Sequence, residues 1–163
     1  MTLIVEDGTG VAGANSYAAV QDLKDYLELR GNEALDLLTD AEIEPLLVKA
    51  TDYIELRYSK KFLGMQLNSD QDLSFPRTDF DGLPPRLVRA CFEYAVIAND
   101  GPLAPLLEQD GSGREVKSKS EDTAGVIKES TTYATTTPRT FRRYPVPDKL
   151  IAPLLRRSQG VIR

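Results

Sequence analysis

The distribution of charge along this 163-residue chain is the feature that most constrains its fold. Residues 1–55 carry a net charge of −9, whereas residues 138–163 carry +6, because Asp148 is the only acid in the second segment. The basic segment is also interrupted by prolines and has too few apolar side chains to bury a core of its own. We therefore expect an extended C-terminal arm over residues 135–163, with a short terminal helix. Surfaces of opposite charge should bind copies of the chain or a partner.

Three segments have the apolar spacing of helices that bury one face. They cover residues 16–30, 39–58 and 84–100. The third is the most apolar and should therefore lie at the centre of the fold. We predict a mainly α fold, in which residues 1–110 form a small bundle of three to four helices.

The ends of these helices carry recognisable signals. Thr39-Asp40-Ala41-Glu42 has the form of a capping box, and Pro84-Pro85 suits the first turn of a helix. Pro45 follows the capping box too late for a first position, so it should distort the opening turn or move the helix start toward Glu44. Asp148 is suited to capping the short helix expected in the arm.

The segment after the bundle predicts a two-stranded β-hairpin that projects from it, over residues 111–134. Residues 114–120 and 125–133 alternate loosely between side chains of different polarity. A polar hairpin of this kind is marginal in water, so a neighbouring chain should stabilise it. The residues expected between subunits are Val116, Lys117, Lys119, Val126, Ile127 and Lys128.

Several function classes are disfavoured by what the chain lacks. It has no histidine, which removes the usual general base, and no complete phosphate-binding loop, because the glycine run 8–13 lacks the required lysine. Cys91, the single cysteine, lies in an apolar helical pattern and should be a core residue. We expect neither an enzyme nor a bound cofactor. We also expect no signal peptide and no membrane span, and therefore synthesis in the cytoplasm.

One carboxylate pattern leaves a metal-dependent hydrolase as an alternative. Asp70, Asp72, Asp79 and Asp81 lie in the connection 62–83 with calcium-like alternation. The EF-hand pattern fails, however, because no bidentate glutamate follows at the required spacing. A solvated loop is the better interpretation.

An ordered set of short motifs resembles a virion family of tailed phages that is often labelled "DnaT-like single-stranded DNA-binding protein". The family is in turn similar to head–tail connector, or adaptor, proteins. The motifs cover nearly the whole chain: Gly13-Ala14-Asn15-Ser16-Tyr17, Tyr26-Leu27, Arg30-Gly31-Asn32, Ala50-Thr51-Asp52-Tyr53-Ile54, Phe75-Pro76-Arg77, Pro84 before a helix with Ala90 and Ala95, Gly101-Pro102-Leu103, Tyr144-Pro145 and Ala152-Pro153-Leu154-Leu155. Pro45 departs from the family pattern.

This resemblance implies a structural protein of the virion neck. The expected assembly is a ring of identical subunits, commonly twelve, that docks under the portal protein and contacts the next neck or tail-completion protein. Duplex DNA would pass through the ring without sequence-specific binding during genome packaging and ejection. The residues expected to contact the portal or a neighbour are Leu150, Ile151, Leu154, Leu155, Arg156, Arg157, Arg142 and Arg143. Truncation at Thr137 should then leave a folded domain that no longer joins the portal.

The alternative takes the family label literally and predicts a single-stranded DNA-binding protein. Such proteins need basic grooves with interleaved aromatic side chains. Arg139, Phe141, Arg142, Arg143 and Tyr144 form the one passable cluster in the sequence. The net charge of −5 and a pI near 4.9 oppose this function, although a local basic patch can still bind DNA.

Overall fold

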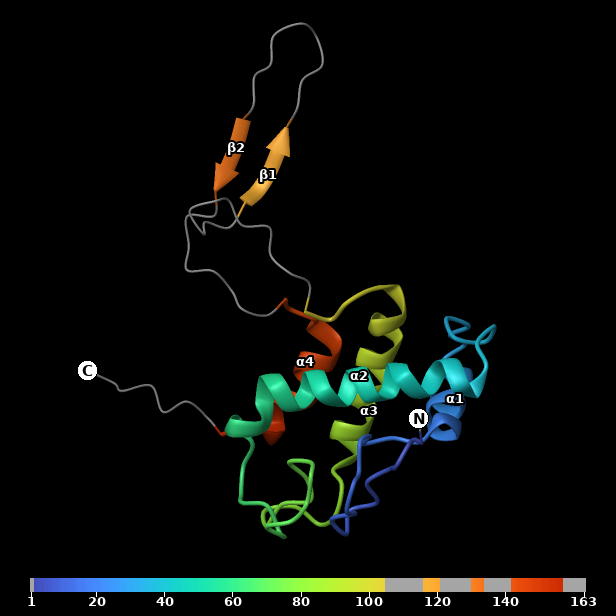
Figure 1. The fold of residues 1–163 in the computed structure, drawn as a ribbon, viewed down its shortest axis with the longest axis vertical. Helices are drawn as coiled ribbons and strands as arrows, with labels where there is room; N and C mark the ends of the chain where they lie inside the picture. Colours follow the sequence, from blue (N-terminus) through green and yellow to red (C-terminus); the bar gives the residue numbers. More distant parts are fainter. Residues whose placement is uncertain (1, 105–115, 121–129, 134–141, 157–163) are drawn as a thin grey trace, which may run out of the picture. The chain divides into compact units, whose positions relative to one another are not determined.

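The computed structural model describes residues 2–104, 116–120, 130–133 and 142–156. It separates the chain into two units, one formed by Met1–Leu103 with Arg143–Arg163 and the other by Ala104–Arg142. The first unit contains all four helices that the described residues form (Figure 1).

The helical unit is arranged around α2 and α3. These helices span Asp40–Tyr58 and Pro85–Asp100, and they pack against each other. The shorter α1 (Val20–Glu28) contacts α2, and α4 (Pro145–Ile151) packs on α3. Single 3₁₀ turns, η1 (Ser59–Lys61) and η2 (Ala152–Leu154), follow α2 and α4.

The helices predicted from the apolar spacing are confirmed, with ends shifted by a few residues. The predicted capping box is also confirmed, because the Glu42 carboxylate accepts hydrogen bonds from the backbone N–H and the hydroxyl of Thr39, at 2.9 and 2.8 Å. Pro45 neither delays nor breaks α2, which runs continuously from Asp40. Its missing N–H leaves the Ala41 carbonyl without its helical donor, close to the helix end where such groups meet water.

The core is built on α3, as its composition predicts. Leu87, Ala90, Cys91, Tyr94 and Ala95 are fully buried, and they occupy more than one face of the helix. A helix that is apolar on several faces needs neighbours on several faces. Here α2 covers one of them and α4 another.

The N-terminal segment is organised by one buried carboxylate, that of Glu6. Glu6 is fully buried and accepts hydrogen bonds from the backbone N–H groups of Gly8, Gly10 and Val11, at 2.8–2.9 Å. The glycine run that follows Glu6 is therefore organised by the chain's own carboxylate. An external phosphate would find these N–H groups already occupied.

The C-terminal segment corrects the expectation of an extended arm. Ile151 and Leu154 are 0% and 4% exposed, and Tyr144 and Pro147 are also buried. Within residues 142–156, these four side chains therefore do not need another molecule to cover them, since the central helices provide that surface. Truncation at Thr137 would remove part of the core, so it would not leave the intact domain that the sequence led us to expect.

The second unit contains two short strands. β1 (Val116–Ser120) and β2 (Ser130–Tyr133) pair antiparallel, with an irregularity in register between Val116 and Ser118. The helical unit contains isolated β-bridges but no sheet within its described residues. The predicted fold class, a bundle with a projecting hairpin and an extended arm, is therefore wrong. In its described part the helical unit has four helices and no sheet, residues 143–156 pack on it, and no projection from the bundle is defined.

Within the described residues, no helix is both long enough and apolar enough to cross a bilayer.

The buried position of Cys91 gives a test of the core. Burial raises the pKa of its thiol to about 11, and the Thr51 hydroxyl is its neighbour at 3.5 Å. We expect the folded protein to resist a thiol reagent such as DTNB at mildly alkaline pH, because the reactive thiolate is both rare and inaccessible. Reaction should become rapid in concentrated guanidinium chloride. Equal rates in the two conditions would contradict this packing.

Candidate nucleic-acid interface

A single carboxylate, that of Asp148, attaches α4 to the two central helices. Arg57 of α2 donates to both of its oxygens, at 3.0 and 2.9 Å. The hydroxyls of Tyr58 and Tyr94 donate to Oδ1 at 2.9 and 2.5 Å, and the backbone N–H of Tyr144 donates to Oδ2 at 3.1 Å. The ion-paired side chains of Arg57 and Asp148 are only 13% and 21% exposed. Charge-assisted bonds in such a partly dry site are strong, so they fix where α4 sits.

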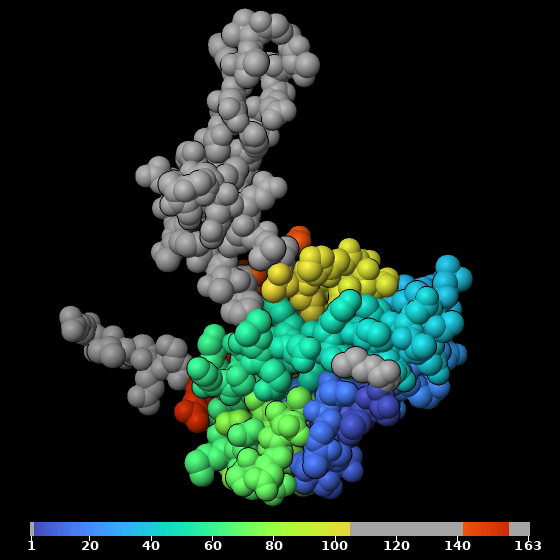
Figure 2. Space-filling model, viewed as in Figure 1, coloured from blue at the N-terminus to red at the C-terminus, as the bar shows by residue number. Residues whose placement is uncertain are grey.

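The position of α4 in turn places the residues that follow it. The Leu63 N–H donates to the Leu154 carbonyl at 3.0 Å, and the Arg156 N–H donates to the Lys61 carbonyl at 2.8 Å. An antiparallel bridge between Phe62 and Leu155 lies between these bonds. The C-terminal segment thus runs alongside the turn that ends α2, and it brings Arg156 next to Lys61. Figure 2 shows this contact at the surface, where the red atoms of the C-terminal segment touch the green atoms of the residues around the end of α2.

Two guanidinium groups converge on the turn after α2. The side chain of Arg77 donates to the carbonyls of Leu63, Gly64 and Ser74, at 2.7, 2.6 and 3.1 Å. Arg156 donates to the carbonyl of Phe62 at 3.1 Å, and it also reaches the Gly64 carbonyl at 3.4 Å. Burial, and secondarily the charge of Arg156, lower the pKa of Arg77.

We name Lys60, Lys61, Arg77 and Arg156 the basic surface. Lys60, Lys61 and Arg156 are exposed, whereas Arg77 lies beneath them at 7% exposure. The ion pairs formed within the described residues join Lys24 to Asp40 and Arg57 to Asp148, so none of the four cations is neutralised by a described carboxylate at contact distance. The sequence separates these cations widely, and the fold gathers them at one end of α2.

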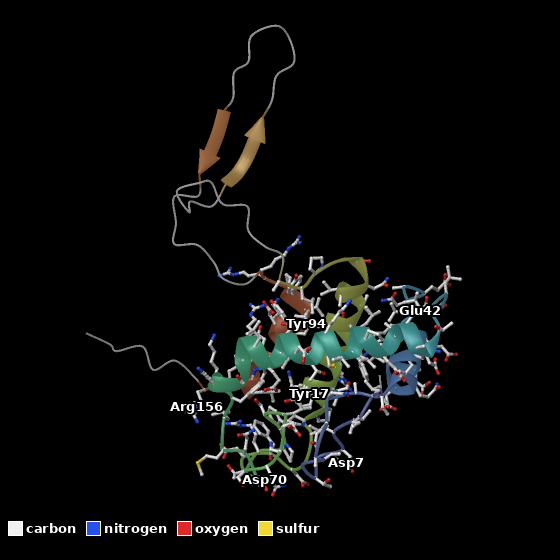
Figure 3. The ribbon with its side chains drawn as sticks, viewed as in Figure 1. Asp7, Tyr17, Glu42, Asp70, Tyr94 and Arg156 are labelled. Atoms are coloured by element: carbon white, nitrogen blue, oxygen red, sulfur yellow. The ribbon has the colours of Figure 1, made fainter. Side chains whose placement is uncertain are left out.

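The opposite end of α2 is acidic. Glu28, Glu33 and Asp36 line an open cavity between α1 and the loop that follows it, and Glu42 lies in the first turn of α2. Figure 3 shows Glu42 and Arg156 at the two ends of α2. The α2 helix has 19 residues, which corresponds to a length of about 28 Å. We call this region the acidic end.

The structure separates the portal-contact residues predicted from the sequence. Ile151 and Leu154 are inside the core, Leu150 and Leu155 are half-buried, and Arg142, Arg143 and Arg156 are exposed. Arg157 lies outside the described residues. An apolar stripe of four side chains is therefore not presented to a partner, because two of its members are already buried.

The other predicted sites are likewise only partly described. For the hairpin, the backbone of Val116, Lys117 and Lys119 is described, whereas Val126, Ile127 and Lys128 lie outside the described residues. In the predicted DNA-binding cluster, Tyr144 is buried and its hydroxyl donates to the Leu103 carbonyl at 2.8 Å. It is therefore unavailable to stack on a base. Arg139 and Phe141 lie outside the described residues.

The acids of the connection 62–83 have separate roles. Asp72 accepts a hydrogen bond from the Gly13 N–H, Asp70 accepts one from Ser69, and Asp79 accepts one from Thr78. Among the described residues, no group of three or more potential ligands is gathered around a common point. Asp72 thus links the connection to the N-terminal segment, whereas, within the described part of the chain, Asp70 and Asp79 bond only to the residue that precedes each of them.

Lys60, Lys61 and Arg77 are members of a site that was not predicted from the sequence. Arg77 was noted only as part of the motif Phe75-Pro76-Arg77. A signal was nevertheless present, because adjacent lysines just after a helix, without a nearby acid in the sequence, indicate a local excess of positive charge. What could not be foreseen was which distant arginines would join them.

The Asp148 contacts predict a large loss of stability on neutralisation of this side chain. Asp148→Asn should lower the free energy of unfolding by about 3 kcal/mol, since it leaves Arg57 partly buried without its charge partner. Denaturant unfolding followed by circular dichroism measures this. Asp36→Asn is the matched control, because Asp36 is exposed, and should change the value by less than about 0.5 kcal/mol. Equal effects would contradict the role of Asp148.

The tyrosines around Asp148 predict weaker folding at alkaline pH. Burial raises the pKa of both Tyr58 and Tyr94, and their hydrogen bonds to Asp148 add to the increase. The unfolded chain therefore loses these protons first, near pH 10. The stabilisation is fully present below about pH 10 and is lost as the pH rises further. The free energy of unfolding, measured at increasing pH, should fall less steeply for Tyr94→Phe than for the natural chain. Equal slopes in the two proteins would contradict this.

Comparison with known proteins gives one match. The model of a family described as "Putative DnaT-like ssDNA binding protein" matches residues 1–163. No curated protein and no solved structure matches the chain. Since the family model covers the full length, the chain belongs to the family of DnaT-like single-stranded DNA-binding proteins.

Proposed function

We propose that this protein binds single-stranded DNA through the basic surface. The observation that carries the proposal is the convergence of four cations that no described carboxylate neutralises at contact distance, in a chain whose family is described as DNA-binding. Lysine and arginine side chains grouped in this way recognise the phosphate backbone, which is common to all sequences. We therefore expect binding without sequence preference.

The acidic end does not oppose this function, because it lies far from the basic surface, and the acids close to Arg77, Glu55 and Asp79, form no ion pair with it. At physiological ionic strength the Debye length is about 8 Å, so exposed charges farther apart than this barely interact. The acidic end and the basic surface lie at opposite ends of α2, whose length is about 28 Å. A strand at the basic surface would thus experience mainly the local positive potential.

Phosphate contacts should contribute more to binding than base stacking at this surface. None of the tyrosines and phenylalanines whose side chains are described is exposed, and only Tyr26 and Phe80 are half-buried. The exposed apolar side chains nearby in the sequence are Leu56, one helical turn before Lys60, Met65 and Leu67. Binding that depends on phosphates is strongly sensitive to salt.

The salt dependence of binding tests the proposal. For single strands, log K falls with log salt concentration by about 0.7 for each phosphate contacted. Lys60→Ala with Lys61→Ala should therefore reduce the magnitude of this slope by about 1.4, because two contacts are lost. Fluorescence anisotropy of a labelled oligothymidine, titrated at several salt concentrations, measures the slope.

A second double variant controls for net charge. Lys49 and Arg86 are exposed cations outside the basic surface, so Lys49→Ala with Arg86→Ala removes the same total charge. Its slope should equal that of the natural chain. The same loss of slope in both double variants, or no binding at low salt by the natural chain, would overturn the proposal.

A second candidate function, a head–tail connector ring, is supported by the opposite charges at the two ends of α2. Each end also exposes apolar side chains: Leu29 and Leu37 near the acidic end, at 85% and 98%, and Met65 near the basic surface. Head-to-tail contacts between such ends repeat around a ring when the rotation closes. In this function the partners are identical subunits and the portal protein, and the protein resides in the virion neck.

The connector function predicts assembly that depends on both charged ends. Native mass spectrometry should detect ring-sized oligomers of the natural chain, alone or with the portal protein of the same phage. Lys60→Glu with Lys61→Glu should abolish them, because like charges would then face each other. A monomer under all conditions, with no portal complex, would exclude this candidate.

A further inference from the structure

The environment of Arg77 is unusual for a buried charge. Arg77 is a buried residue, with 7% of its surface exposed, yet its guanidinium donates its hydrogen bonds to three neutral carbonyls. A buried charge normally needs a charged partner as well as hydrogen bonds. Here the carbonyl oxygens accept hydrogen bonds from the N–H groups, but because they are neutral they do not neutralise the positive charge of the guanidinium.

Arg156 adds a second positive charge at the same point. Its Nη2 and the Nη2 of Arg77 both donate to the Gly64 carbonyl, at 3.4 and 2.6 Å. The Nε group of Arg156 is held by the Phe62 carbonyl at 3.1 Å, while its Nη1 makes no hydrogen bond within the described residues. The exposed guanidinium is therefore oriented by the chain and keeps donors available for an external acceptor.

The nearby acids do not cancel this charge. Glu55 and Asp79 act on Arg77 only at a distance, and neither forms an ion pair with it. The carboxylate oxygens of Glu55 accept hydrogen bonds from the hydroxyls of Tyr17 and Ser74 instead. The two arginines thus raise the positive potential of a site in which no described carboxylate forms an ion pair with either of them.

The backbone that joins the two guanidiniums is tightly constrained. Gly64 has φ = +71°, a conformation that favours glycine. A Cβ atom at this position would lie 2.9 Å from the Thr78 hydroxyl and 3.0 Å from the Asp79 backbone nitrogen. The shared carbonyl is therefore held in place, and the geometry around it exists before any ligand binds.

We propose that one phosphate group of the bound strand is held at Arg156, above the buried charge of Arg77 and beside Lys61. This inference rests on the proposed DNA-binding function and assigns a fixed contact within it. The guanidinium fork offers two parallel N–H donors to two phosphate oxygens, a match that lysine cannot make. Arg77 acts through its charge from beneath the surface, so it is a positioning residue.

Inorganic phosphate is the probe that tests this site without DNA. It is titrated into ¹⁵N-labelled protein at constant ionic strength, with chloride as the reference anion. We expect saturable shifts of the Arg156 Nε–H and the Gly64 amide resonances. Arg156→Lys keeps the charge but lacks the fork, and it should weaken phosphate binding about tenfold. Lys49→Ala with Arg86→Ala should leave the affinity unchanged.

The phosphate titration and the DNA titration can fail independently. Two results would overturn the fixed contact and leave the DNA-binding function standing. One is DNA binding without saturable phosphate shifts, and the other is a phosphate affinity of Arg156→Lys equal to that of the natural chain. Saturable phosphate shifts without DNA binding would overturn both the strand as the source of the phosphate and the proposed function. Binding of both, weakened together by Arg156→Lys, supports the inference. Arg77 itself is left intact in this design because it also holds the connection 62–83 in place.

Discussion

The bonds to the Asp148 carboxylate are the interaction on which the rest of the structure depends. The α4 helix has only seven residues, and helices shorter than about 12 residues are marginal in water. Its apolar side chains contribute some stability, but burial alone is not directional. The bidentate contact with Arg57, together with the hydroxyls of Tyr58 and Tyr94, fixes the orientation of α4 on the two central helices. Asp148 thereby determines the path of the backbone that follows α4.

The basic surface follows from this attachment. The residues after α4 can pair with the turn after α2 only when α4 is correctly oriented, because η2 and the Phe62–Leu155 bridge follow directly. Arg156 then lies beside Lys61 and above Arg77. The one acid of the basic C-terminal segment is thus what brings a cation of that segment into the site. Its negative charge is already paired with Arg57, so it subtracts little from the potential there.

The helices of the core could be predicted from the sequence, because their signals are local. The capping box at Thr39 and the apolar pattern of α3 act within a few residues, and both were interpreted correctly. The attachment of α4 was missed because the apolar residues of the C-terminal segment were considered without a partner. Two signals pointed to it: α3 is apolar on more than one face, and Arg57 falls on the buried side of α2. An arginine on the buried side of a helix usually pairs with an acid, as Arg57 does with Asp148.

The basic surface could be predicted only in part. The pair Lys60-Lys61 is visible as a local excess of charge, but its convergence with Arg77 and Arg156 depends on long-range contacts. Hydrophobic periodicity determines which residues face the core, and it carries no information on which exposed cations become neighbours. Net charge was also a poor guide, since it adds acids and bases that the fold holds at opposite ends of α2.

The two candidate functions draw on the same surface, and this makes them physical competitors. A neighbouring subunit would present its acidic end to the basic surface, whereas a DNA strand would present phosphates to it. Both ligands are anionic, but the strand carries its charge at regular short spacing and releases condensed counterions on binding, which a folded acidic surface does not do to the same extent. Low salt therefore favours the strand more strongly than it favours a second subunit. The guanidinium fork of Arg156 suits phosphate oxygens and carboxylates alike, but together with the buried Arg77 it concentrates positive charge at one point, which attracts most strongly the ligand with the denser negative charge. The arrangement of charge around Gly64 is thus better matched to a polyanion than to a protein surface with a few separated carboxylates.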